Sequence, residues 1–184
     1  VFATHNKNKL REIKEMVKDI PGMENFNIVS MPDVGITDDI VEDGNTYEEN
    51  ALIKAKYVHE KTGMISFADD SGIEIDALGG KPGIYSARFL GEDTPYSEKA
   101  KYVVDKLQGK TGDERKAHYI CSMAIIFPDG RAETTIGKLD GFIANEVSDG
   151  EYGFAYDKIM YIPELGKTFS RSKTKRKECY KSSS

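Results

Sequence analysis

Two adjacent carboxylates, Asp69 and Asp70, are the side chains of this sequence best suited to chemistry. They follow the apolar run Ile65–Ala68, which has the length of a buried strand, and they precede Ser71 and Gly72. A strand that ends this way places acidic groups where open α/β folds bind ligands, and a carboxylate there can hold a hard cation. Because neighbouring strand residues point to opposite faces, we expect the two carboxylates to do different jobs. An ordinary strand-to-loop turn would use the same residue types.

A polar turn near the N-terminus is the second candidate site. Val1–Thr4 has the pattern of a strand end, and the apolar period of Leu10–Ile20 predicts a helix after the turn. A strand, a turn and a helix in this order direct free backbone N–H groups at a phosphate, to which Asn6 and Lys9 could add a hydrogen bond and a charge. The alternative is that Asn6 only caps a surface helix, because the turn contains no glycine-rich loop.

A third carboxylate, Glu42, stands in an acidic stretch before another helix. Thr46 and Glu49 have the spacing of a capping box, and Gly63 marks the end of that helix. Small residues such as Ala55 predict a helix that packs close to a sheet. Glu42 would then be able to point into a cleft.

An aromatic segment, Gly150–Asp157, is the last candidate site. Phe154 and Tyr156 alternate with Ala155 and are followed by Asp157. Rings in such a segment can stack on a purine while the carboxylate and the backbone contact its edge. A glycine-led loop whose aromatic residues belong to the core is the competing interpretation.

The remaining patterns predict an α/β protein. We expect strands at Phe26–Met31, at Gly72–Leu78 as an antiparallel partner of the central strand, and in a hairpin of His118–Phe127 with Ala132–Leu139. We expect a further helix at Pro95–Leu107.

Composition narrows the function classes. The chain has 184 residues, 31% of them charged and 39% hydrophobic, which fits one domain with a buried core. No apolar run has membrane-spanning length, no signal peptide begins the sequence, and two cysteines make no disulfide framework, so we expect a cytoplasmic protein that does not act at a membrane. The net charge of the chain is −5. Residues 170–184 carry +5, so residues 1–169, the body of the chain, carry −10. An acidic body argues against a nucleic-acid binder.

Taken together, these stretches resemble the inosine triphosphate pyrophosphatase family, also called the Ham1-like or non-canonical purine NTP pyrophosphatases. The matching segments are Phe2–Lys9 (family T-x-N-x-x-K), Glu42–Ala51, Ala68–Gly72, Leu78–Arg88 and Gly153–Asp157. The resemblance spans residues 1 to about 169, and the central block from Asp69 to Arg88 is its most specific part.

The resemblance implies a fold and an activity. The fold is an elongated, two-lobed α/β subunit with a central mixed sheet flanked by helices, an active-site cleft between the lobes, and assembly as a homodimer. Residues 1–169 would form this single domain. The activity is hydrolysis of ITP, dITP and XTP to the monophosphate and pyrophosphate, with Mg²⁺ as cofactor.

The resemblance also assigns roles. Glu42 and Asp70 would hold the metal, Asp70 would accept the proton of the attacking water, and Asp69 would support it. The expected substrate-binding residues are Thr4, His5, Asn6, Lys7, Asn8, Lys9, Ser71, Phe154, Ala155, Tyr156 and Asp157. Mg²⁺ usually takes one or two carboxylates plus phosphate oxygens, which matches that set.

The sequence departs from the family at three places. Ala155 and Lys158 stand where the family has Gly and Pro. Residues 170–184 form an atypical basic tail that lacks the base-reading Ser-His-Arg motif, and a catalytically weakened nucleotide-binding protein is therefore the alternative function. A pyrophosphatase for modified pyrimidines, as in Maf proteins, is a more remote interpretation. The tail itself is either frameshifted or a disordered basic arm for nucleic acid or an acidic partner.

The frameshift hypothesis is open to a direct test. A back-translation of the tail, read from two bases before the codon of Arg171, gives A-E-V-K-L-K-E-K-N-A-I-S-H-R, the continuation that the family has. We expect the coding DNA around codon 170 to contain codons compatible with that frame. Sequencing checks this, and synonymous codons that break the shifted reading would remove the hypothesis.

Overall fold

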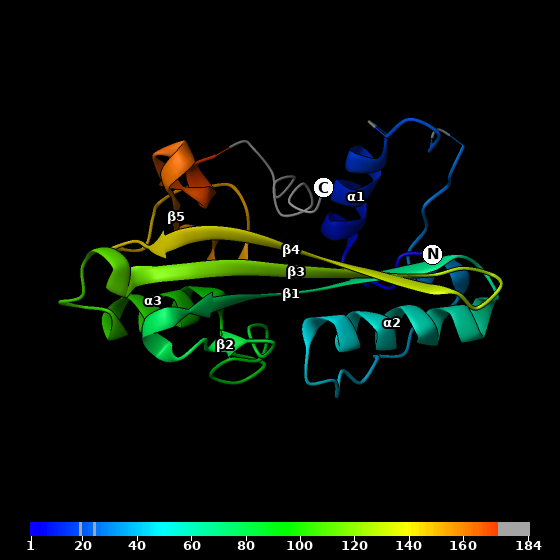
Figure 1. The fold of residues 1–184 in the computed structure, drawn as a ribbon, viewed down its shortest axis with the longest axis horizontal. Coiled ribbons are helices and arrows are strands. Elements are labelled where there is room, and N and C mark those ends of the chain that lie inside the picture. Colours follow the sequence, from blue (N-terminus) through cyan, green and yellow to red (C-terminus); the bar gives the residue numbers. More distant parts are fainter. Residues whose placement is uncertain (19, 24, 173–184) are drawn as a thin grey trace. The chain divides into compact units, whose positions relative to one another are not determined.

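The structure is a computed structural model that describes residues 1–18, 20–23 and 25–172 (Figure 1). Its α-helices are α1 (Lys7–Val17), α2 (Tyr47–Thr62) and α3 (Tyr96–Lys106). Its strands are β1 (Ser66–Ile75), β2 (Pro82–Gly83), β3 (Lys116–Ile126), β4 (Ala132–Ile143), β5 (Met160–Ile162) and β6 (Lys167–Thr168). Within these residues no helix combines the length and the apolar character that crossing a bilayer requires.

The strands form a sheet in the order β2-β1-β3-β4-β5-β6. β1 pairs antiparallel with β2, and β5 pairs antiparallel with both β4 and β6. Parallel pairing is recorded at Phe2, which forms isolated bridges with Ser30 and Phe67. The fold is therefore α/β, as the sequence predicts.

The chain divides into two compact units. The first contains Val1–Asp70 and Ser122–Ile136, and the second contains Ser71–Cys121 and the described residues from Gly137 onward. The division falls within β1, β3 and β4, so each of these strands contributes residues to both units.

In the first unit, α1 and α2 lie on opposite sides of the sheet (Figure 1). The α2 side is built from small residues, since Ala51 and Ala55 are fully buried in a cluster with Ala68 of β1. The α1 side holds Ile13 in a second cluster, against which Phe67 of β1 packs. Successive residues of β1 thus face different helices, which is the ordinary alternation of a strand.

The predicted helix α2 is confirmed. The hydroxyl of its N-cap Thr46 accepts a hydrogen bond from the Glu49 N–H at 3.1 Å, and Gly63 ends the helix with a left-handed φ of 65°. α3 and the β3–β4 hairpin are also found where the sequence predicts them, although β4 continues to Ile143.

The expected end of the central strand is wrong. β1 does not stop at Asp69 and Asp70 but continues through Ile73 and Ile75, both fully buried. The chain turns later, at the 3₁₀ turn Asp76–Leu78. The predicted antiparallel return over 72–78 is therefore the second half of the same strand. The carboxylates fit inside the strand because lysines reach them from both helices.

Three other boundaries differ from expectation. Val1–Thr4 and Phe26–Met31 form isolated bridges rather than strands, since Thr4 N–H bonds back to Phe2 O at 2.8 Å and so ends the extended pairing. α1 runs from Lys7 to Val17 instead of from Leu10 to Ile20.

The first three residues of the expected tail, 170–172, pack in the second unit. Ser170 and Ser172 are buried, and the Arg171 guanidinium pairs with Asp149 at 2.6 Å. The start of the segment is thus part of the second unit, and residues 173–184 lie outside the described part of the chain.

The N-terminal segment is held by Phe2, whose ring stacks on Phe67 with centroids 4.9 Å apart. Phe2 is 1% exposed, and we expect Phe2→Ala to lower the free energy of unfolding by about 3–5 kcal/mol because it empties a packed site. Phe26, which is 53% exposed, is the matched control, and Phe26→Ala should cost no more than about 0.5 kcal/mol. Denaturant unfolding followed by circular dichroism measures both; equal losses would contradict this packing.

Candidate active site

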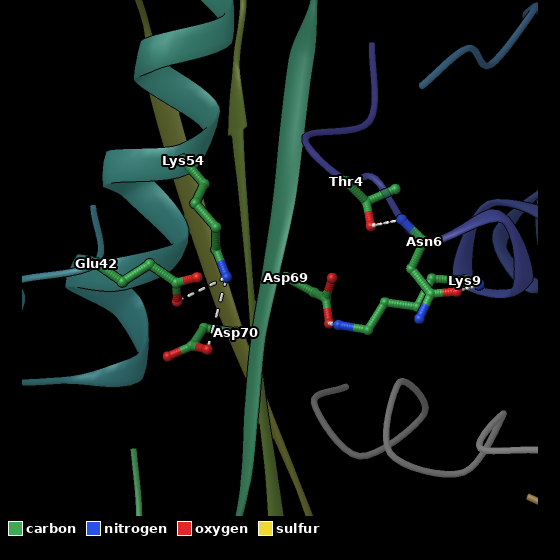
Figure 2. A network of polar contacts seen from close by, with 7 residues as sticks. All are labelled: Thr4, Asn6, Lys9, Glu42, Lys54, Asp69 and Asp70. Carbon is green, nitrogen blue, oxygen red and sulfur yellow. Dashed lines mark hydrogen bonds and ion pairs between the residues drawn. The ribbon is translucent and has the colours of Figure 1, made fainter. Parts of the chain in front are cut away.

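Asp69 and Asp70 lie on opposite sides of β1, and each is buried against a different lysine (Figure 2). Lys9 of α1 donates from Nζ to Asp69 Oδ2 at 2.8 Å. On the other side, Lys54 of α2 lies 3.6 Å from Asp70 Oδ1, and Asn50 Nδ2 donates to Asp70 Oδ2 at 3.1 Å. The two carboxylates therefore have different partners on the two sides of the strand.

Lys54 also binds Glu42. Its Nζ donates to Glu42 Oε2 at 3.0 Å, so a single ammonium joins a carboxylate of the loop before α2 to a carboxylate of β1 (Figure 2). The Lys54 side chain is only 12% exposed. Glu42 and Asp70, the two metal ligands that the family resemblance implies, therefore both contact the ammonium of Lys54.

Sequence reasoning missed Lys54 and Asn50. Both come from the face of α2 that contacts the sheet, where a fully buried asparagine is followed four residues later by a lysine. The sequence did contain a signal for them, since Asn50 and Lys54 are a polar pair among small apolar residues. Residues four apart share a helix face, so both had to lie on the packed side of the helix. Asn50 is itself fixed, since its Oδ1 accepts from Gly44 N–H at 2.9 Å.

Burial raises the pKa of the Asp70 carboxyl above its usual value, because the charged form loses water. The neighbouring carboxylates Glu42 and Asp69 act in the same direction, whereas Lys54 and the hydrogen bond from Asn50 lower the pKa. A carboxyl with a raised pKa holds a proton more readily than an ordinary aspartate. This suits a group that must accept a proton from water.

The donor set around Lys54 fits a small hard cation with incomplete protein ligation. Among the described residues no three His, Cys, Asp or Glu side chains are grouped as a metal site, so Glu42 and Asp70 would be a two-carboxylate set. Mg²⁺ is commonly bound by one or two carboxylates, with water and substrate phosphates as its other ligands.

The start of α1 is an ordinary capped helix. Asn6 Oδ1 accepts from the N–H groups of Asn8 and Lys9 at 2.9 and 3.2 Å, and Asn6 N–H donates to Thr4 Oγ1 at 3.1 Å. Asn6 is thus the N-cap of α1, and those two N–H groups have acceptors. His5 contacts Asp38 O at 3.1 Å through Nε2.

The aromatic segment belongs to the second unit, where most of it is structural. Asp157 is 1% exposed and accepts from Tyr119 Oη at 2.7 Å and from Phe154 N–H at 2.8 Å. Tyr156 is also buried, and its hydroxyl donates to Ser86 O at 3.1 Å. Phe154, by contrast, is 39% exposed.

The expected site residues thus fall into two groups. Thr4–Lys9, Glu42, Asp69 and Asp70 belong to the first unit, and Figure 2 draws some of their polar contacts. Ser71 and Phe154–Asp157 belong to the second unit.

Comparison with known sequences agrees with the family resemblance of the motifs. The sequence model of the Ham1 family matches residues 1–182. The chain is 38% identical over 170 residues to the dITP/XTP pyrophosphatase of Bacillus subtilis, covering 92% of this chain and 83% of that protein. It is 40% identical over 180 residues to a dITP/XTP pyrophosphatase of Thermus thermophilus, covering 98% and 84%.

Solved structures agree with the sequences. The Staphylococcus aureus Ham1 protein superposes with a TM-score of 0.80 at 33% identity, covering 93% of this chain and 84% of that one. A HAM1 protein from Coxiella burnetii gives a TM-score of 0.82 at 31% identity, covering 93% and 85%.

Ala155 carries a testable strain. Its φ of 56° is left-handed, a region in which a Cβ costs roughly 1–2 kcal/mol. We expect Ala155→Gly to raise the free energy of unfolding by about 0.5–1 kcal/mol, since the greater freedom of unfolded glycine offsets part of the relief. Ala132→Gly, at the exposed start of β4, is the control and should lower stability slightly. Destabilisation by both substitutions in thermal unfolding would show that Ala155 is unstrained.

Proposed function

The chain belongs to the Ham1 family, and from that membership and its acidic site we propose that it hydrolyses non-canonical purine nucleoside triphosphates, with dITP, ITP and XTP as substrates. The products are the nucleoside monophosphate and pyrophosphate. The observation that carries the proposal is the convergence of Glu42 and Asp70 on one buried cation position. A pair of carboxylates from separate segments is the arrangement that a metal-assisted attack on a phosphate requires.

In this proposal Asp70 accepts the proton of the attacking water. The water oxygen forms a bond to the α-phosphorus, the bridging bond to the β-phosphate breaks, and pyrophosphate leaves with the bonding electrons. The raised pKa of Asp70 supports this role, and Asn50 orients the carboxylate by binding its Oδ2. No covalent nucleophile is needed, because phosphoryl transfer depends mainly on alignment and charge neutralisation.

Glu42 and Asp70 are the residues that would hold Mg²⁺, which when bound would neutralise phosphate charge and polarise the phosphate oxygens. Lys9 and Lys54 are two cations of the first unit that could contact a triphosphate, and each is paired with a carboxylate. Thr4 and the exposed side chains of residues 5–8 complete the phosphate-binding segment in this proposal.

For the base we propose stacking on Phe154, one of two exposed rings of the aromatic segment together with Tyr152. Tyr156 and Asp157 would act by holding the segment, since both are buried and bonded to protein groups. Ser71 would contact the substrate. Assembly as a homodimer and a cytoplasmic location stay predictions of the family resemblance.

Pyrophosphate release across a nucleotide panel, with and without Mg²⁺, tests the activity. We expect turnover of dITP, ITP and XTP well above that of dATP and dGTP, and dependence on the metal. Asp70→Asn should fold as the wild type does and lose at least about 10²–10⁴-fold in turnover, the usual contribution of a general base.

Asp113→Asn is the matched control for this series, because the Asp113 carboxylate is 82% exposed. Turnover of Asp70→Asn equal to that of the control would overturn the role of Asp70. Binding of dITP without turnover by the wild type would instead favour the alternative, a weakened nucleotide-binding protein.

A further inference from the structure

Lys54 occupies the place between the two proposed metal ligands. Its Nζ is 3.0 Å from Glu42 Oε2 and 3.6 Å from Asp70 Oδ1, and its stem descends from the face of α2 that packs on the sheet (Figure 2). The ammonium therefore places a positive charge between the two carboxylates.

Electrostatic repulsion opposes the binding of the ammonium and of a divalent cation at this place at the same time. A divalent cation bound by Glu42 and Asp70 would lie beside an ammonium that is hydrogen-bonded to Glu42 and ion-paired with Asp70, and adjacent like charges with little water between them repel strongly. Asp70 Oδ1, the oxygen that pairs with Lys54, is an atom for which Lys54 and a metal would compete.

We propose that Lys54 is the built-in counter-ion of the metal site and is exchanged when a divalent cation binds. The metal displaces the ammonium from Glu42 and Asp70, and the displaced ammonium becomes available to a phosphate oxygen of the substrate. This inference rests on the proposed function only in taking Glu42 and Asp70 as metal ligands.

The side chain is suited to such an exchange. Lysine is a compact point charge on a flexible four-carbon stem, so its head can move by a few ångström while α2 stays in place. Arginine would bind carboxylates with a rigid fork and would leave them less easily. The site thus exchanges the Lys54 ammonium for a metal ion without a movement of the backbone.

Metal titration without nucleotide tests the exchange. Mg²⁺ binding is measured by calorimetry and Mn²⁺ binding by electron paramagnetic resonance, on the full chain. Lys54→Met keeps the stem and removes the charge, and we expect it to bind either ion at least about tenfold more tightly than the wild type, because a competing like charge is gone. Unchanged or weaker binding would overturn the proposal.

Two further variants keep the test decisive. Lys56→Met on the same helix is the control, because Lys56 is 70% exposed and pairs only loosely with Glu60 at 3.9 Å, and it should bind metal as the wild type does. Lys54→Arg keeps the charge, and it tests the exchange by itself if Lys54→Met does not fold. It should bind metal more weakly than the wild type, and equal or tighter binding would contradict the exchange.

Thermal unfolding gives an independent readout. Without metal, Lys54→Met should melt below the wild type, because Glu42 and Asp70 then repel each other, and added Mg²⁺ should raise its melting temperature by more than it raises that of the wild type. A smaller rise in the variant would contradict the proposal.

Failure of this inference and failure of the proposed function give different results. If the wild type releases pyrophosphate from dITP but the metal affinities do not follow this order, only the exchange is wrong. If the affinities follow the order and no nucleotide is hydrolysed, the exchange stands and the proposed activity fails.

Discussion

Two ionisable carboxylates next to each other in a buried strand impose the central constraint on the first unit. Neighbouring residues of β1 face opposite sides, so a single cation cannot serve both. Asp69 receives Lys9 from α1, and Asp70 receives Lys54 from α2. Each helix therefore supplies a packing face and also the charge that makes the acidic centre of the strand tolerable inside the fold.

This constraint explains the composition of the helix surfaces. α2 comes close to the sheet through Ala51 and Ala55, and the resulting short distance lets Lys54 reach Asp70 from the same face. Asn50, one turn earlier, completes the contacts of that carboxylate and is itself fixed by Gly44. The α2 side thus contains two carboxylates and an ammonium, the combination on which the proposed exchange depends.

The second unit shows a different use of polar groups. Asp157 and Tyr156 are buried and fasten the aromatic segment to Tyr119 and to the backbone of Ser86. These bonds specify one conformation of the segment, since a buried polar group that lost its partner would be costly. The rings that the segment exposes are those of Tyr152 and Phe154.

The sequence alone determined the helices with strong caps, the β3–β4 hairpin, the family and the identity of the acidic residues, because these depend on local patterns or on whole motifs. It did not determine that β1 continues through Asp69 and Asp70, since two adjacent aspartates are locally typical of a turn. Nor did it identify Lys54, whose importance comes from partners 12 and 16 residues away in the chain. Only the tertiary structure decides such contacts, because burial and the pairing of charges depend on residues that folding brings together.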